Sequence, residues 1–142
     1  MFFKTKKEKA KEKVKKDPYA LSEIPFQFSN DEDIVMIAVQ QDANVLEYAS
    51  DRLRDNKNLV MVAVKELGVA LEFASEELQN DKEIVMAAVK QDGYALAFAS
   101  HELRNDKEVV LEAVIRNKHA LDYVAEELLE DVAFIEALKS LD

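Results

Sequence analysis

Several residue types are scarce or missing in this 142-residue chain, and each absence excludes a class of structure. Cysteine is absent, so neither a disulfide framework nor a cysteine–zinc site can form. The two glycines and two prolines are too few for a fold with many tight turns. No apolar run approaches the roughly 20 residues of a membrane-spanning helix. These absences predict a soluble domain whose core forms without disulfides or structural metals.

The charge of the chain is divided unevenly along its length. Residues 1–16 contain eight lysines against Glu8 and Glu12, whereas residues 17–142 contain 11 basic and 27 acidic residues. The formal net charge is −10. An acidic body repels phosphate backbones and anionic lipid, so we do not expect it to bind nucleic acid or a membrane surface. We expect a cytoplasmic protein.

An internal repeat with a period of about 25 residues organises the sequence. Without insertions it gives the units 42–66, 67–91, 92–116 and 117–142, and a degraded copy covers 17–41, or about four and a half copies in all. The positions that agree are mostly apolar. They are Leu46, Leu71, Leu96 and Leu121; Leu53, Leu78, Leu103 and Leu128; Ala38, Ala63, Ala88 and Ala113; and the aromatic residues Tyr48, Phe73, Phe98 and Tyr123.

Each unit is predicted to contain two short helices. In residues 92–116, Leu96, Ala99 and Leu103 have helical spacing, and Ser100 is expected to cap the segment after a turn. Asn or Asp at 105–106, followed by Glu108, predicts the start of the second helix. A buried strand is the competing interpretation of an apolar run such as 84–89, but the acidic cap and the alanines favour helix. Gly68 and Gly93 lie between units, where a left-handed C-cap is expected.

A helix pair this short cannot bury its apolar face alone. Neighbouring units must therefore pack on one another. The sequence therefore predicts an all-α protein, an α-solenoid of helix-turn-helix repeats in residues 17–142. We expect the recurring leucines and aromatic residues to form its core. Residues 1–16 are treated as a separate basic helix or arm, in which Thr5 and Glu8 form a capping box and Asp17-Pro18 ends the helix.

The repeated pattern resembles a tandem-repeat family catalogued as domain of unknown function 4116. The resemblance covers residues 17 to about 138 and departs from the pattern at 24–26 and 129–132, as expected for terminal units. It implies a bacterial helical-repeat protein with no established activity, and delivery to a host cell if the source is host-associated. The residues that carry it are Ala95-Leu96, Phe98-Ala99-Ser100, Glu102-Leu103, Asn105–Val110 and Ala113-Val114.

No catalytic, cofactor-binding or metal-binding residue stands out. His101 aligns with the acidic residues of other copies, and His119 occupies a position that varies, so we interpret both as exposed surface residues. Paired carboxylates recur at the same register in each unit, which is typical of caps on a solvated face rather than of an acid–base pair. We therefore expect a protein that is not an enzyme and needs no cofactor.

Two sets of positions vary between the copies and are the predicted binding surface. In a solenoid, equivalent positions align into rows, and the rows that are free to vary are those on which a ligand is recognised. A protein or peptide is the expected partner, and the chain is expected to be a monomer or weak oligomer. The two rows are Asn44, Val69, Tyr94 and His119, and Gln40, Lys65, Lys90 and Ile115.

The basic arm offers an alternative function. Its lysines favour binding to nucleic acid, with a strong dependence of affinity on salt. The arm has only Ala10 and Val14 as apolar residues within its helical stretch, which argues against a membrane-surface helix. We consider three states of the arm: it frays in solution, it docks on the acidic body, or it binds RNA. Simple solvation is the default expectation.

Overall fold

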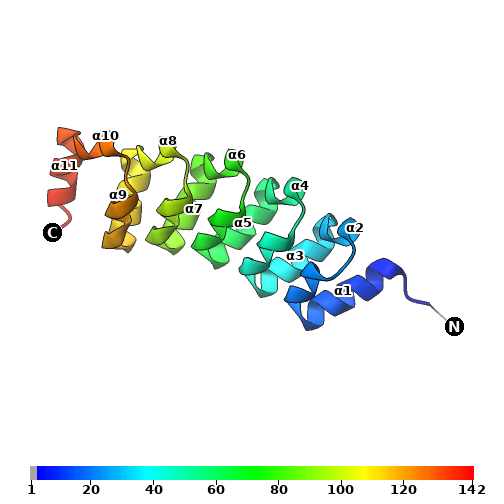
Figure 1. Ribbon diagram of the computed structural model, residues 1–142. Helices are drawn as coiled ribbons and strands as arrows, with labels where there is room; N and C mark the ends of the chain where they lie inside the picture. Colours follow the sequence, from blue (N-terminus) through cyan, green and yellow to red (C-terminus); the bar gives the residue numbers. More distant parts are fainter. Residues whose placement is uncertain (1–2) are drawn as a thin grey trace.

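The computed structural model describes residues 3–142, which form an extended array of short helices with no strand among them (Figure 1). The prediction of an all-α solenoid is confirmed. The alternative of a buried strand at 84–89 is wrong, because these residues lie within helix α7, Lys82–Gln91. The N- and C-terminal units lie at opposite ends of the array.

Each unit contains three helical pieces, not the two that we predicted. A 3₁₀ helix comes first, then a single turn of α-helix, then a longer α-helix. Helix α1 (Lys6–Lys16) precedes the first unit. The units comprise η1 (Pro18–Ser22), α2 (Phe26–Ser29) and α3 (Glu32–Gln41); η2 (Ala43–Tyr48), α4 (Asp51–Arg54) and α5 (Lys57–Glu66); η3 (Gly68–Phe73), α6 (Glu76–Gln79) and α7 (Lys82–Gln91); η4 (Gly93–Phe98), α8 (His101–Arg104) and α9 (Lys107–Arg116); and η5 (Lys118–Tyr123), α10 (Glu126–Leu129) and α11 (Val132–Lys139).

An extended residue explains why the first predicted helix is divided. Ala99 adopts φ −73° and ψ 156°, which ends η4 before Leu103 is reached. Ser100 then caps α8, because its hydroxyl accepts a hydrogen bond from the Leu103 N–H at 3.2 Å. The capping role of Ser100 is confirmed, but the helical spacing of Leu96, Ala99 and Leu103 does not place them on one helix. Leu96, Ala99 and Leu103 are all buried even so, because the bend returns the chain to the same core.

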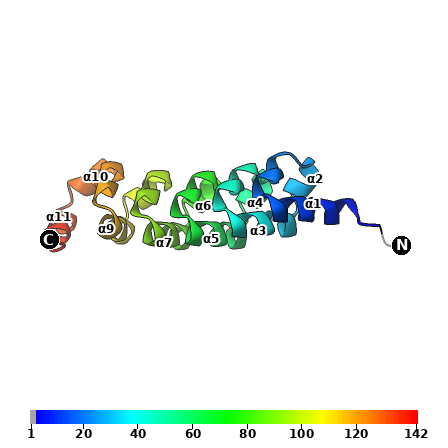
Figure 2. The same cartoon turned by 90° about the horizontal axis from the view of Figure 1, so that it is seen from below.

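The helices form two layers (Figure 2), and the single-turn helices lie along one edge of the array (Figure 1). The longer helices α3, α5, α7 and α9 pack side by side in one layer, and the 3₁₀ helices pack against them and against one another. Between the layers lie fully buried leucines and alanines. The aromatic positions lie nearer the edge of this core: Phe73, Phe98 and Tyr123 are half-buried, and Tyr48 is 36% exposed. Core packing therefore describes the leucines better than the aromatic residues.

Backbone hydrogen bonds join each unit to the next at the same position. The N–H of Ser50 donates to the carbonyl of Ser29 at 3.0 Å, and the N–H of Ser75 donates to the carbonyl of Arg54 at 2.9 Å. Equivalent bonds recur at the next two junctions, from Ser100 to Gln79 and from Ala125 to Arg104. These bonds satisfy backbone groups at the ends of the single-turn helices, so they hold the units in one register.

The two glycines serve close packing rather than a left-handed turn. Neither has a positive φ, so the predicted left-handed C-cap is wrong. A Cβ at Gly68 would lie 2.4 Å from the carbonyl oxygen of Ala88, and one at Gly93 would lie 2.2 Å from that of Ala113. The starts of η3 and η4 thus touch the backbone of the next long helix, which only glycine permits at this distance.

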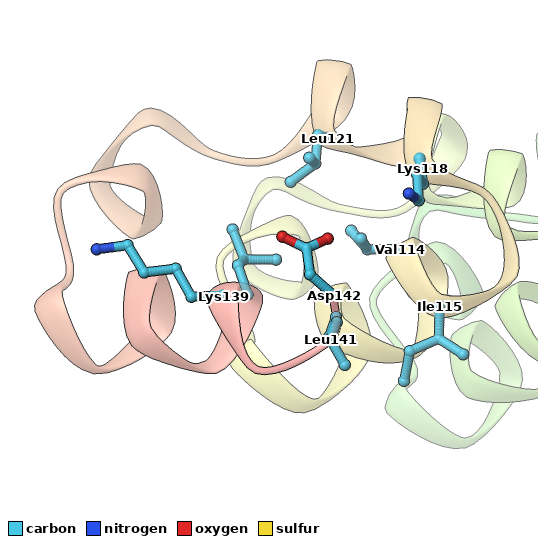
Figure 3. Close-up of a pocket in the computed structure, with 8 residues that line it drawn as sticks. Val114, Ile115, Lys118, Leu121, Lys139, Leu141 and Asp142 are labelled. Atoms are coloured by element: carbon cyan, nitrogen blue, oxygen red, sulfur yellow. The ribbon is translucent and has the colours of Figure 1, made fainter.

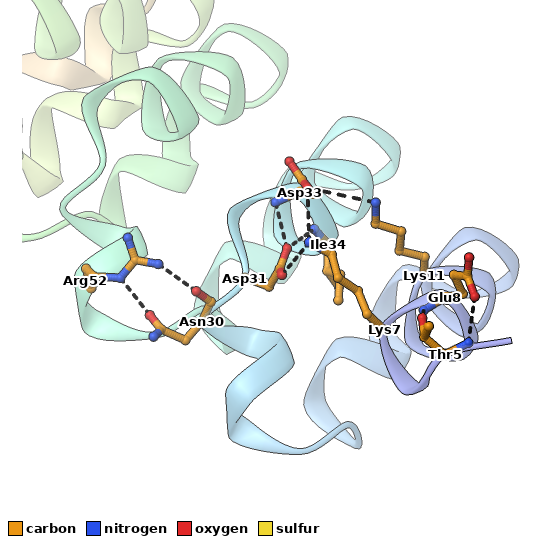
Figure 4. A network of polar contacts seen from close by, with 9 residues as sticks. All are labelled: Thr5, Lys7, Glu8, Lys11, Asn30, Asp31, Asp33, Ile34 and Arg52. Atoms are coloured by element: carbon orange, nitrogen blue, oxygen red, sulfur yellow. Dashed lines mark hydrogen bonds and ion pairs between the residues drawn. The ribbon is translucent and has the colours of Figure 1, made fainter.

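Helix α1 is docked against the body (Figure 4). Ala10 and Val14 are buried on α3, at the register that Val35 and Val39 occupy one repeat later. The predicted capping box is confirmed, because the Thr5 hydroxyl accepts from the Glu8 N–H at 3.1 Å and the Glu8 carboxylate accepts from the Thr5 N–H at 2.6 Å. Our default of a solvated arm is therefore wrong: α1 is the first long helix of the stack.

Candidate binding surfaces

The structure places the two variable rows on different layers of the solenoid. The row of Gln40, Lys65, Lys90 and Ile115 lies in the last turns of the long helices, and we name it the long-helix row. All four of its side chains are exposed. The row of Asn44, Val69, Tyr94 and His119 lies on the 3₁₀ helices, and we name it the 3₁₀ row. A ligand on one layer would therefore contact one row, not both.

The centre of the long-helix row borders a groove between α5 and α7. This groove has a volume of about 520 Å³. Its apolar wall consists of Met61, Met86 and Ala87, which are half-buried on the core. Lys65 and Lys90 line the same groove, one from each helix, so two members of the row are brought together here. Glu83 and Gln91 complete the lining.

The methionines of this groove belong to a row that we did not single out from the sequence. Met36, Met61, Met86 and Leu111 recur once per repeat on successive long helices, and all four are half-buried. Their spacing was available as a signal, but it is equally typical of core positions. Only the structure shows that these side chains reach the surface. Methionine is flexible and polarisable, so such a row can adapt to differently shaped apolar partners.

The 3₁₀ row is more closely tied to its own elements. The Asp42 carboxylate accepts from the Asn44 N–H at 2.9 Å and from its side-chain amide at 3.1 Å. The ring of Tyr94 is 40% exposed and makes edge contacts with Phe98 and Tyr123, at centroid distances of 6.2 and 5.2 Å. Val69 is half-buried and His119 is exposed. These residues lie apart from the methionine-lined groove.

A row of lysines on the long helices pairs with carboxylates of the following unit. Lys57 Nζ lies 2.8 Å from both Asp81 Oδ2 and Glu83 Oε2, and its pKa is raised first by Asp81 and then by Glu83. The same arrangement recurs at Lys82 with Asp106 and Glu108, and in part at Lys107 with Asp131. Lys7 of α1 pairs in the same way with Asp31 and Asp33, at 2.7 and 3.2 Å (Figure 4).

The lysine row is interrupted at one place, where both partners change together. Glu32 occupies the lysine position, and the acidic positions of the following unit hold Asn56 and Asn58. A carboxylate at 56 would place two like charges opposite each other, whereas asparagine still caps the helix by accepting from the Leu59 N–H at 3.0 Å. These ion pairs therefore help to pack the units together. They also occupy lysines and carboxylates that would otherwise be available to a ligand.

A second groove lies at the C-terminal end, between α9, η5 and α11 (Figure 3). Its volume is about 530 Å³. The apolar lining comprises Val114, Ile115, Leu121, Leu138 and Leu141, and Lys118, Lys139 and Asp142 are its polar residues. Ile115, the last member of the long-helix row, is 58% exposed in this groove. Gln40, the first member, lies on α3, away from both grooves.

Lys118 distinguishes the junction at the C-terminal groove from those before it. It stands at the position of Gly68 and Gly93, where a side chain would meet the next long helix. Accordingly α11 packs much more loosely on α9 than α9 packs on α7. The apolar side chains that α11 would otherwise cover are left partly exposed.

The histidines and acidic clusters lie on the outer surface. His101 Nε2 is 3.1 Å from Glu127 Oε1, with both side chains largely exposed. His119 lies on η5, in the neighbouring unit. Within residues 3–142, no group of three His, Asp or Glu side chains is arranged to hold a metal ion. None of the described helices has the length and hydrophobicity that crossing a membrane requires.

The repeat matches one known family along most of the chain. The model of a domain of unknown function, DUF4116, matches three times, at residues 6–54, 56–104 and 88–129. The chain belongs to the DUF4116 family. The first match begins at the start of α1, so the DUF4116 pattern extends further towards the N-terminus than the predicted start at residue 17. Neither the curated proteins nor the solved structures gave a match.

Proposed function

We propose that this DUF4116 protein works by binding a segment of another protein on its long-helix layer. The observation that supports this is the groove between α5 and α7, in which half-buried methionines lie beside exposed lysines. The ion pairs between the long helices use Lys57 and Lys82, one turn or more away from Lys65 and Lys90. Lys65 and Lys90 are thus available to a ligand.

The chemistry of the groove indicates what the partner should carry. Met61 and Met86 would accept an apolar side chain, and the two ammonium groups would pair with carboxylates beside it. Packed helices are about 8–10 Å apart, which is close to the separation of residues i and i+3 in an extended peptide. The expected ligand is therefore an apolar side chain flanked by acidic residues. The acidic residues elsewhere on units 17–142 would disfavour binding of such a peptide outside the groove.

A peptide array tests the proposal directly. The array would display short peptides with every combination of apolar and acidic positions, and fluorescence anisotropy would then measure the affinity of those that bind. Changing Lys65 and Lys90 together to Glu should weaken binding by at least tenfold, because attraction becomes repulsion. Met86→Asp should do the same by removing the apolar wall.

The matched control is Tyr94→Ala on the 3₁₀ row, which should leave the affinity unchanged. The lysine variant and Tyr94→Ala should keep the urea midpoint of the parent to within a small shift, since these side chains are exposed. Met86 is half-buried on the core, so Met86→Asp should lower the midpoint, and its binding is compared only under conditions in which circular dichroism shows that it is folded. The proposal would be wrong if the array yielded no binder, or if Tyr94→Ala abolished binding while the groove variants did not.

The contacts of α1 weigh against the alternative of nucleic-acid binding. Lys7 and Lys11 face α3 and pair with Asp31 and Asp33, so part of the positive charge of the arm is neutralised within the chain. Lys4 likewise pairs with Glu12 within the same segment. Binding of a protein segment in the groove between α5 and α7 therefore remains the proposed function.

A further inference from the structure

The two ends of the solenoid carry opposite charges. Helix α1, at one end, contains seven lysines and two glutamates. The unit 117–142, at the other end, contains two lysines and seven carboxylates. Glu126, Glu127, Glu130 and Glu136 are all exposed there. Opposite charge at the two ends of an elongated molecule favours contact between the head of one copy and the tail of another.

The two ends also carry complementary apolar features. Phe3 lies just before α1 and is 85% exposed, the most exposed of the large apolar side chains in residues 3–142. The C-terminal groove presents Ile115 and Leu141 beside the buried Val114. A cavity of roughly 150 Å³ is enough to hold a benzene ring. The groove, at about 530 Å³, has room for a phenylalanine side chain and part of its backbone.

We propose that a second copy of this chain occupies the C-terminal groove, inserting Phe3 between Ile115 and Leu141. In this arrangement the lysines of α1 face the carboxylates of the last unit. The two surfaces are different patches of the molecule, so the contact is heterologous and leaves one free head and one free tail. It therefore produces head-to-tail chains rather than closed dimers.

Sedimentation of the full chain over a range of concentrations tests the association. At low salt the weight-average mass should rise with concentration beyond that of a dimer. At about 0.5 M salt it should return towards the monomer, because screening weakens the charge attraction. A mass that stays at the monomer value at millimolar concentration and low salt would overturn the proposal.

Two single variants identify the surfaces. Phe3→Ala and Ile115→Asp should each weaken association at least tenfold. In the Ile115→Asp variant, the new negative charge would face the lysines of α1 and attract them. A loss of association would therefore result from the lost apolar contact and not from charge repulsion. Phe26→Ala, which changes another highly exposed aromatic residue, is the control and should associate like the parent. All three positions are exposed, and urea unfolding would verify that each variant is folded.

Mixing the two defective variants distinguishes this contact from a symmetric one. Phe3→Ala retains a working groove and Ile115→Asp retains a working Phe3, so their mixture should form dimers but no longer chains. If Phe3→Ala alone associated as well as the parent, the groove would instead mediate a two-fold dimer, and the proposal would be wrong. The peptide-binding groove at Met86 is not changed in this experiment, so its outcome does not depend on the proposed function.

Discussion

The junction between α7 and α9 and the junction between α9 and α11 use the same repeat but differ at one decisive position. At the first, Gly93 lets the 3₁₀ helix touch the backbone carbonyl of Ala113. At the second, Lys118 stands at the equivalent position, and α11 packs loosely beside an open apolar groove. The two junctions therefore differ both in the residue at this position and in how closely their long helices pack.

Junctions nearer the N-terminus lie between these extremes. Ala43 occupies the glycine position between α3 and α5, and those helices pack less closely than α5 and α7. Gly68 and Gly93 thus stand at the most closely packed junctions and Lys118 at the loosest, whereas Pro18 and Ala43 stand at junctions that are intermediate. This pattern indicates that the spacing of the units is set locally, as expected when each repeat contacts only its neighbours.

The largest loss of stability is expected from emptying the core of the tight junction. Leu96 is fully buried, so Leu96→Ala should lower the free energy of unfolding by about 2–5 kcal/mol through lost burial and a residual cavity. Its equivalent one unit later, Leu121, is only half-buried in the loose junction. Leu121→Ala should therefore cost about 1–2 kcal/mol. Urea unfolding followed by circular dichroism measures both.

The ratio of the two losses is the informative quantity. Equal losses would mean that α11 seals its junction in solution as tightly as α9 does, and that the C-terminal groove is closed. A midpoint unchanged by Leu96→Ala would contradict the packing role of the leucines altogether.

A smaller effect is expected from adding one methyl group at the tight junction. Gly93→Ala would place its Cβ against the carbonyl oxygen of Ala113, so the helices must separate, at a cost of about 1–3 kcal/mol. The φ of Gly93 is not positive, so backbone strain does not contribute to the loss. Lys118→Ala, at the loose junction, should change stability by less than about 0.5 kcal/mol. Thermal unfolding of the two variants would show whether close approach is the reason for the glycine.

The architecture could be predicted from the sequence because the repeated units can be compared with one another. Leu71 and Leu96 agree in position and type, and such agreement predicts a shared core without knowledge of the coordinates. The local backbone geometry was harder to predict from the sequence. Spacing alone does not reveal that Ala99 is extended, because an extended residue between two helical turns preserves the same apolar face.

The surfaces were harder to predict than the fold. Variation between copies made Lys65 and Lys90 candidate binding residues, a role that stays a prediction. Nothing in the pattern distinguishes the half-buried Met86, which lines the same groove, from a core residue. The composition of α1 does not indicate that it packs as the first long helix, because Ala10 and Val14 are its only buried apolar residues, whereas the other long helices have a wider apolar face. Both depend on the packing of units against each other, which a single repeat does not encode.

The smallest expected effect concerns the lysine row and its dependence on pH. Partial burial alone would raise the pKa of Asp106, but hydrogen bonds from Lys82 at 3.0 Å and from the Val109 N–H at 3.1 Å hold that pKa below its ordinary value of 3.8. The unfolded state therefore binds the proton more readily. The contribution to stability is present above about pH 4 and is lost as the pH falls through the lower pKa of the folded state.

Asp106→Asn isolates this contribution, because Asn56 shows that asparagine caps the same position while lacking the charge. At pH 7 the variant should melt a few degrees below the parent at most, since exposed ion pairs stabilise weakly. The difference between the two proteins should shrink below pH 4, where the Asp106 carboxylate takes up its proton and loses its advantage. A difference in melting temperature that did not shrink at all as the pH fell below 4 would show that the substitution acts through packing at the junction, not through the charge that joins one unit to the next.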